Sequence, residues 1–338
     1  MISAPSPPDL IGQSQAFLDA LDHASRVAAI DRPILVMGER GSGKELIAAR
    51  IHFLSTRWDG PLIKVNCAAM NEALLESELF GHEAGAFTGA TKRHQGRFER
   101  AEGGSLFLDE IASASLRVQE KLLRVIEYGE YERIGGEETR HADVRIIAAA
   151  NLDLRVQARD GNFRADLLDR LAFDVVATPP LRERPEDIPL LTAHFGVSAA
   201  NELGVTFPGF TAEAMTKLKS HGWPGNVREL KNAAERAVFH WAAAELDGPV
   251  SEIELDPFKK AFGPISGKEK QASATNIPPP VANDETQSDL RAHLNEVEKS
   301  LVKRALMQHG GNQKRAGIAL SLSYDQIRGL VKKHNLSA

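Results

Sequence analysis

A glycine-rich segment near the start of the chain has the residue types that bind phosphates. It fits the pattern GxxxxGK and consists of Gly38, Glu39, Arg40, Gly41, Ser42, Gly43 and Lys44. It lies between an apolar run and a helical pattern, which is the strand–loop–helix order of a P-loop. Glycines let backbone N–H groups turn toward phosphate oxygens, and Lys44 can reach the β and γ phosphates. Because Glu45 stands where a hydroxyl residue usually binds Mg²⁺, a simple glycine turn is the alternative.

Two consecutive acids form a second chemical segment. Asp109 and Glu110 follow an apolar run at 106–108, which predicts a buried strand. At the carboxyl end of a parallel strand, these acids would lie at the sheet edge where α/β proteins bind ligands. We expect Asp109 to hold Mg²⁺ through water and Glu110 to polarise the attacking water. Together the two segments predict hydrolysis of a nucleoside triphosphate.

Short apolar runs alternate with helical patterns in the first half of the chain. The runs that predict strands are 34–37, 62–65, 106–108, 144–149 and 173–176. Strands that alternate with helices indicate an α/β fold with a parallel sheet covered on both faces. After Pro185 the strand signal ends, and helices are predicted at 188–201, 211–221 and 227–240. Asn226 is expected to cap the last of these helices.

Composition and charge limit the class of protein. The 338 residues contain one cysteine, Cys67, which excludes an internal disulfide or a thiolate zinc site. No apolar run is long enough to span a bilayer and the first ten residues lack a secretion signal, so we expect a cytoplasmic protein. Residues 291–338 carry nine Lys and Arg against three acids, although the whole chain has a net charge of −5. A basic tail on an acidic body suggests that the tail binds a polyanion.

A polar stretch that contains three consecutive prolines divides the chain. Residues 263–289 have few apolar side chains and cannot bury enough surface to fold alone, which indicates a flexible linker. The predicted organisation has five parts. They are an N-terminal extension at 1–9, an α/β nucleotide-binding subdomain at 10–184, a helical lid at 185–262, the linker at 263–289 and an all-α module at 290–338.

One hexapeptide points to a family. It has the sequence GAFTGA and consists of Gly85, Ala86, Phe87, Thr88, Gly89 and Ala90. With it, residues 10–258 resemble the AAA+ domain of bacterial sigma-54-dependent transcription activators, in which glutamate regularly follows the P-loop lysine. The resemblance implies that the hexapeptide contacts sigma-54 in the closed promoter complex. It also implies that a hexameric ring, with a dimer as a resting alternative, hydrolyses ATP with Mg²⁺ to open the promoter.

The resemblance assigns roles to three residues around the acids. Asn66 resembles the switch residue that holds Glu110 inactive until ATP binds, since a short amide can hydrogen-bond a carboxylate. Arg164 and Arg170 resemble arginine fingers, which enter the neighbouring subunit's site and offset charge on the γ phosphate. On the residues alone, these arginines could instead form ion pairs with nearby acids on a surface helix.

Three further segments match family positions. Asn151 lies in the first-sensor segment, where Ala150 replaces the usual threonine. Arg228 resembles the second sensor, which reaches from the lid to the nucleotide. Residues 130–140, which include Gly135, resemble a second loop that moves with the GAFTGA loop.

The C-terminal module has the pattern of a helix, a tight turn and a second helix. Asn312 and Ser323 can cap the two helices. The module resembles a Fis-type helix-turn-helix, which implies that it binds enhancer DNA. The residues suited to phosphate and base contacts are Lys314, Arg315, Tyr324, Gln326, Arg328 and Lys332. A basic three-helix bundle that binds a protein is the alternative.

Control is expected to come from a separate protein, because only about nine residues precede the AAA+ region. Trp58 and its neighbours resemble the subgroup of these activators that controls phage shock genes. In that subgroup an inhibitor of the phage shock protein A type contacts this tryptophan. Burial in the core is the alternative for Trp58. The predicted function is therefore ATP-dependent activation of sigma-54 RNA polymerase, and the alternative is an AAA+ DNA-binding repressor or remodeller that does not act on sigma-54.

Overall fold

The computed structural model describes residues 10–258, 290–320, 322–334 and 336. The chain divides into two compact units, Met1–Gly263 and Pro264–Ala338. The predicted N-terminal extension and the whole predicted linker lie outside the described residues. Within the described residues, no helix is long and apolar enough to cross a membrane.

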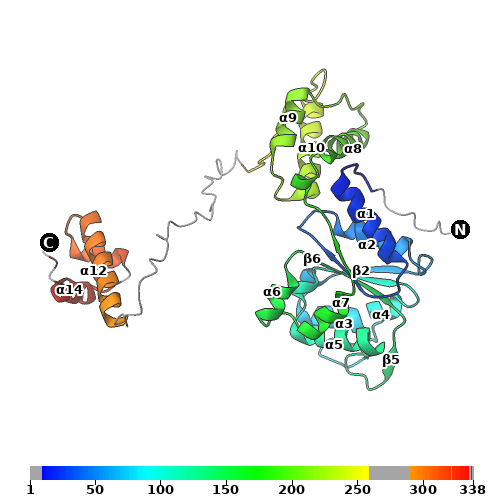
Figure 1. Ribbon diagram of the computed structural model, residues 1–338, viewed down its shortest axis with the longest axis horizontal. Coiled ribbons are helices and arrows are strands. Elements are labelled where there is room, and N and C mark those ends of the chain that lie inside the picture. Colours follow the sequence, from blue (N-terminus) through cyan, green and yellow to red (C-terminus); the bar gives the residue numbers. More distant parts are fainter. Residues whose placement is uncertain (1–9, 259–289, 321, 335, 337–338) are drawn as a thin grey trace, which may run out of the picture. The chain divides into compact units, whose positions relative to one another are not determined.

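A five-stranded parallel sheet forms the centre of the first unit (Figure 1). Its strands are β1 (Ile34–Met37), β2 (Leu62–Asn66), β3 (Ser105–Asp109), β6 (Arg145–Ala150) and β7 (Val175–Ala177), in the order β2-β3-β6-β1-β7. All five predicted strands are present; β1 has the predicted bounds, and those of the other strands differ by one or two residues. Since parallel strands end at the same edge, the segments that follow β1, β3 and β6 meet there.

Helices cover both faces of the sheet, because successive strand residues point to opposite sides. Ile34 and Val36 of β1 pack with α1 (Gln15–Ala28) and α2 (Lys44–Phe53). Leu106 and Leu108 of β3 face α3 (Glu72–Phe80), α5 (Leu116–Tyr128) and α7 (Ala165–Leu171). The shorter helices are α4 (Arg97–Arg100), α6 (Leu154–Arg159), η1 (Cys67–Ala69), η2 (Ile111–Ser113) and η3 (Leu181–Glu183). The predicted α/β fold is confirmed.

Two loops of the first unit lie against each other. The GAFTGA segment lies between α3 and α4, and a hairpin of β4 (Glu130–Glu132) and antiparallel β5 (Thr139–His141) follows α5. Glu83 donates its backbone N–H to the carbonyl of Ile134 (3.0 Å), and Ile134 donates to that of Gly81 (3.0 Å). The segment predicted as a second loop is therefore bonded to the base of the first.

Three helices form the lid of the first unit. They are α8 (Asp187–Leu203), α9 (Ala212–Ser220) and α10 (Asn226–Ala243), and Figure 1 shows them gathered at the end of the unit where α1 and α2 lie. Trp223 is fully buried in their apolar core, and its indole N–H donates to the carbonyl of Leu218 (2.9 Å). The predicted helical lid is confirmed.

The predicted cap of the last lid helix is wrong. Asn226 is the first residue of α10 and has a left-handed φ of 53°, and Gly225 is the N-cap residue. The side-chain oxygen of Asn226 accepts a hydrogen bond from the backbone N–H of Leu181 (2.7 Å), not from the first turn of α10. A contact with a distant segment therefore replaces the local cap.

The second unit contains three helices within its described residues. They are α12 (Leu290–Gln308), α13 (Gln313–Ala319) and α14 (Tyr324–Lys333). A small core that includes Val302, Ala316 and Ile327 joins them. The two predicted caps are confirmed, because Asn312 accepts from the N–H of Arg315 and Ser323 accepts from that of Gln326.

Candidate active site

The P-loop joins β1 to the N-terminus of α2, as predicted. Gly41 and Gly43 have positive φ angles of 74° and 105°, which glycine adopts without steric cost. Lys44 is buried, and its ammonium group donates to the carbonyls of Gly38 (2.9 Å) and Glu39 (3.0 Å). Burial lowers the pKa of Lys44, while the nearby carboxylates of Asp109 and Glu110 act in the opposite direction. The ammonium group of Lys44 is thus held inside the P-loop, where phosphates would bind.

Asp109 and Glu110 stand at the carboxyl end of β3, opposite the P-loop. Burial raises the pKa of Asp109, and the backbone N–H of Glu110, which donates to its carboxylate (2.9 Å), opposes that rise. Glu110 has a left-handed φ of 51°, a strained backbone for a residue with a side chain. Its carboxylate lies 3.9 Å from the guanidinium of Arg40. Strain of this kind is common where a side chain must point in a fixed direction for chemistry.

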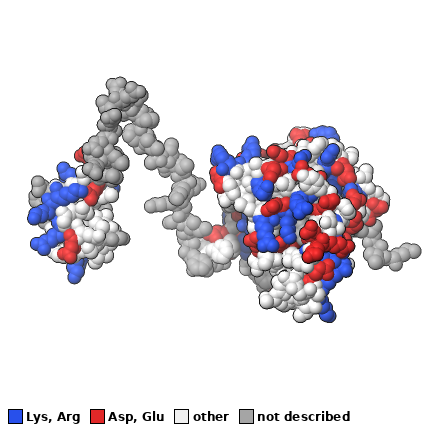
Figure 2. Space-filling view, turned by 90° about the horizontal axis from the view of Figure 1, so that it is seen from below, with Lys and Arg blue, Asp and Glu red and all other residues white. Residues whose placement is uncertain are grey.

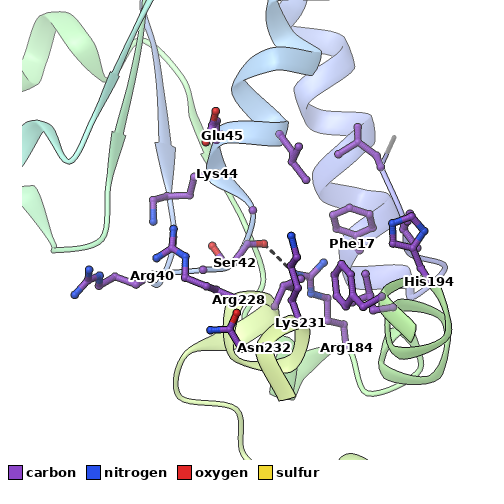
Figure 3. A pocket seen from close by; sticks show the side chains of 18 of the residues that line it. Phe17, Arg40, Ser42, Lys44, Glu45, Arg184, His194, Arg228, Lys231 and Asn232 are labelled. Carbon is purple, nitrogen blue, oxygen red and sulfur yellow. Dashed lines mark hydrogen bonds between the residues drawn. The ribbon is translucent and has the colours of Figure 1, made fainter. Parts of the chain in front are cut away.

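A cavity of about 620 Å³ lies over these residues. The predicted site residues that line it are Arg40, Gly41, Ser42, Gly43, Lys44, Glu45, Asp109, Glu110 and Arg228. Figure 3 shows Lys44 and Arg228 directed toward the same space, whereas Arg40 extends to one side. Glu45 points away from that group and pairs with Lys64 (2.9 Å). The structure therefore brings the P-loop, both acids and the predicted second sensor together.

An apolar end of the cavity was not predicted from the sequence. Leu10 and Ile11 from the start of the described chain meet Leu191 and Phe195 of α8 and Val227 of α10. Such a surface suits the flat face of an adenine ring, whereas the P-loop end suits phosphates. No local pattern could reveal this grouping, because its members come from three separate parts of the sequence.

The predicted switch and first-sensor residues lie at the same edge of the sheet but do not line the cavity. Asn66 ends β2 in register with Asp109. Its side-chain oxygen accepts from the N–H of Ala68 (2.9 Å), and within the described residues no hydrogen bond joins it to Glu110. Asn151 directly follows β6. The switch and sensor roles of these residues stay predictions.

The two predicted arginine fingers lie outside the cavity of their own chain. Arg164 pairs with Asp166 (2.7 Å), and Arg170 pairs with Glu127 (2.8 Å). Both guanidinium groups are substantially exposed, so these ion pairs contribute little to stability and can be exchanged for another anion. The pairs fit the surface-helix alternative, and entry into a neighbouring site stays a prediction.

The lid contacts the P-loop through Glu39, a contact that the sequence did not indicate. Arg182 donates two hydrogen bonds to the Glu39 carboxylate (2.7 and 2.8 Å). The amide nitrogen of Asn226 donates to Glu39 Oε2 and to the carbonyl of Arg40, both at 3.0 Å. These donors lower the pKa of Glu39 to about 2. Any movement of the lid must therefore act on the P-loop directly.

The GAFTGA segment forms an exposed turn. Gly85 and Gly89 have positive φ angles, and Gly85 donates its N–H to the carbonyl of Ala90 (2.7 Å). The side chain of Phe87 is 48% exposed, and its ring meets the edge of the His82 ring at a centroid distance of 4.9 Å. An exposed aromatic ring on a glycine-rich turn is suited to contact with another protein.

A buried guanidinium connects the two loops. Arg133 of the hairpin segment is almost fully buried and pairs with Glu83, at the base of the GAFTGA turn, and with Glu99 of α4. Gly135 approaches the same turn so closely that an added Cβ would lie 2.7 Å from the Cβ of Ala86. The two loops are therefore packed and paired as one structure.

The chain matches known families over nearly all of its first unit. A family model described as the sigma-54 interaction domain matches residues 10–176, and one described as the AAA+ ATPase lid domain matches residues 182–256. The Psp operon transcriptional activator of Escherichia coli (strain K12) is 51% identical over 329 residues, which cover 97% of this chain and 98% of that protein. The chain belongs to the sigma-54-dependent transcriptional activators.

A second relative and a solved structure also match this chain. The transcriptional activator HyfR of Escherichia coli (strain K12) is 53% identical over 231 residues, which cover 68% of this chain and 34% of that protein. The crystal structure of NtrX from Brucella abortus in complex with ATP superposes with a TM-score of 0.68 at 31% identity. That match covers 97% of this chain and 70% of that chain. The activator is therefore an AAA+ ATPase, and its family favours action on sigma-54 over the alternative of a regulator that lacks it.

Replacing Gly135 by Ala should separate hydrolysis from activation. The new Cβ would collide with Ala86, and the φ of 73° is strained for alanine, with a cost of about 1–3 kcal/mol. We expect sigma-54-dependent open-complex formation to fall by about tenfold, while ATP turnover stays within about twofold, because the loop does not line the cavity. Gly136→Ala is the matched control, since its Cβ would meet Glu83 at an acceptable 3.4 Å. Equal activation by both variants would contradict the packing of the two loops.

Replacing Glu39 by Gln should lower the melting temperature in a pH-dependent manner. The folded-state pKa of about 2 lies below the ordinary 4.5, so the carboxylate stabilises the fold above pH 4.5 and loses this effect as the pH falls toward 2. Because the side chain is 41% exposed, we expect a loss of only a few degrees at pH 7. Thermal melts from pH 7 downward measure it, with exposed Glu252→Gln as the control. A difference that did not shrink on acidification would be inconsistent with this ion pair.

Proposed function

We propose that ATP hydrolysis in this cavity moves the GAFTGA turn against sigma-54 and so opens the promoter. The observation that carries this proposal is the path of the chain between Asn66 and Asp109, which are partners in the sheet register. The intervening segment leaves the sheet edge, forms α3, the GAFTGA turn and α4, and returns as β3 to the two acids. A rearrangement at the acids therefore acts on the turn through both ends of the segment.

The site residues divide the chemical work. The P-loop N–H groups and Lys44 bind and orient the phosphates, and Glu110 holds the water that attacks the γ phosphate. Asp109 fits a divalent cation. Its carboxylate is partly buried, and burial disfavours the negative charge that a bound cation would stabilise. Mg²⁺ held there would offset charge on the phosphate oxygens. Arg228 reaches the cavity from the lid, and Arg164 and Arg170 would complete the site of a neighbouring subunit in a hexamer.

The C-terminal unit is proposed to bind enhancer DNA. On the face shown in Figure 2, Lys and Arg side chains gather over this unit. All six predicted contact residues are exposed on α13 and α14. The side-chain oxygen of Gln326 accepts from the N–H of Ser323 (2.8 Å), which leaves its amide N–H groups for a base edge. The short turn between α13 and α14 supports a helix-turn-helix over a protein-binding bundle.

The regulatory target is proposed to be the phage shock operon. Similarity over almost the full length of the Psp operon activator supports this assignment. The side chain of Trp58 is 58% exposed, which is inconsistent with the alternative of core packing and suits contact with a phage shock protein A type inhibitor. Arg57 fixes the loop beside it through Asp31 (2.8 Å) and Asp143 (2.6 Å).

Substitution of Thr88 tests the proposal. Thr88 is exposed at the turn and does not line the cavity, so Thr88→Ala should leave ATP turnover within about twofold of wild type while open-complex formation is lost. Lys44→Ala should abolish both, because the phosphates lose their cation. Exposed Thr91→Ala, just beyond the turn, is the matched control and should behave as wild type. Normal activation by Thr88→Ala, measured with sigma-54 holoenzyme and ATP, would refute the assigned role of the turn.

A further inference from the structure

A short segment at the start of the described chain touches both halves of the first unit. This segment, residues 10–14, is called the strap here. Leu10 packs against the core formed by α1, α2 and the sheet, whereas Ile11 packs against the core of the lid. Both side chains also line the apolar end of the cavity. The strap therefore closes that end while it bridges the sheet and the lid.

One buried carboxylate of the lid holds the strap. Asp187, the first residue of α8, is completely buried. Its Oδ1 accepts from the backbone N–H groups of Gln13 (2.6 Å) and Ser14 (2.8 Å), and its Oδ2 accepts from the hydroxyl of Ser14 (2.8 Å). A buried carboxylate is costly unless such donors surround it, and here the strap supplies three. The strap is thus fixed to the lid by a charge-assisted cluster.

The same cluster continues to the P-loop. Arg184 is buried, and its guanidinium lies 4.8 Å from the centre of the Phe17 ring, in the first turn after the strap. Its Nη2 donates to the carbonyl of Ser42 (2.9 Å), a bond drawn in Figure 3, while its Nε is buried without a hydrogen-bond partner among the described residues. The strap, the lid and the P-loop are therefore joined along one wall of the cavity.

The strap is tightly packed at Gly12. A Cβ added to Gly12 would lie 2.3 Å from the ring of Phe17 and 2.9 Å from Oδ2 of Asp187. Any side chain at position 12 must therefore disturb the packing of the strap against Phe17 and Asp187. Replacing Gly12 by Ala therefore disturbs the strap without removing a group from the lid core.

We propose that Asp187 is a positioning residue for nucleotide recognition, which holds the strap so that Leu10 and Ile11 close over the adenine ring. The inference rests on the cavity being the ATP site. Since the strap contributes apolar surface only at the base end, its release should weaken binding of the base and leave phosphate binding at the P-loop intact. A purely structural role would instead weaken both.

Two ligands separate these outcomes in the full-length chain. ADP carries the base and the phosphates, and pyrophosphate carries phosphates alone. We expect Asp187→Ala and Gly12→Ala each to lower ADP affinity by about tenfold, with pyrophosphate affinity within about twofold of wild type. Asp187→Asn keeps an oxygen that can accept from Gln13 and Ser14, so it should recover most of the ADP affinity. Isothermal titration calorimetry measures the affinities, and thermal melts without nucleotide establish that each variant is folded.

If Asp187→Ala does not fold, Gly12→Ala alone tests whether the strap contributes to ADP affinity. Wild-type ADP affinity in folded Gly12→Ala would overturn the proposal, and so would an equal loss of ADP and pyrophosphate affinity. Lys44→Ala tests the cavity separately, because it should lose affinity for both ligands. Full ADP binding by Lys44→Ala would contradict the ATP site itself, and the inference with it.

Discussion

The proposed coupling of hydrolysis to movement depends on one buried charge that must stay paired. The guanidinium of Arg133 is 1% exposed and lies between Glu83 and Glu99. Separating the buried guanidinium from both carboxylates would leave its positive charge uncompensated, which is unfavourable. The hairpin, the base of the GAFTGA turn and α4 are therefore constrained to move together. Because α4 leads directly into β3, the same constraint extends to the acids at the end of that strand.

A second set of polar contacts links the nucleotide to the lid. Glu39 belongs to the P-loop itself, yet its partners Arg182 and Asn226 belong to the segments that begin the lid. The strap adds a bridge at the other end of the cavity. Sheet and lid are thus connected both through the P-loop and through the apolar end of the cavity. In the proposed mechanism, a nucleotide in the cavity therefore acts both on the position of the lid and on that of the GAFTGA turn.

Sequence patterns predicted the parts of the molecule that depend on local order. The P-loop, the strand that ends in Asp109 and Glu110, and the helical lid follow from periodicity and glycine placement, because neighbouring residues determine them. The GAFTGA turn was identified by its sequence, and its exposure follows from its glycines. The predicted roles that need a second subunit or a nucleotide, such as those of Arg164 and Asn66, stay predictions.

Contacts between distant segments could not be predicted. The expected cap at Asn226 was wrong because a tertiary hydrogen bond from Leu181 takes the side-chain oxygen of Asn226, and Gly225 stands at the N-cap position of α10. The apolar end of the cavity and the strap on Asp187 join residues more than 170 positions apart, as the bond between Gln13 and Asp187 illustrates. Leu10 and Ile11 carry no signal of their own, since isolated apolar residues are common everywhere.

The most direct test of the account measures the position of the GAFTGA turn in each nucleotide state. The sequence has a single cysteine, Cys67, which is buried and whose thiol has its pKa raised to about 12 by burial, so introduced cysteines can be labelled selectively. Spin labels at Thr88→Cys and at exposed Arg32→Cys, in protein diluted with unlabelled chains, report one distance within a protomer. The account predicts that this distance distribution shifts between the ADP state and a state with a non-hydrolysable ATP analogue. An identical distribution in every nucleotide state would contradict it.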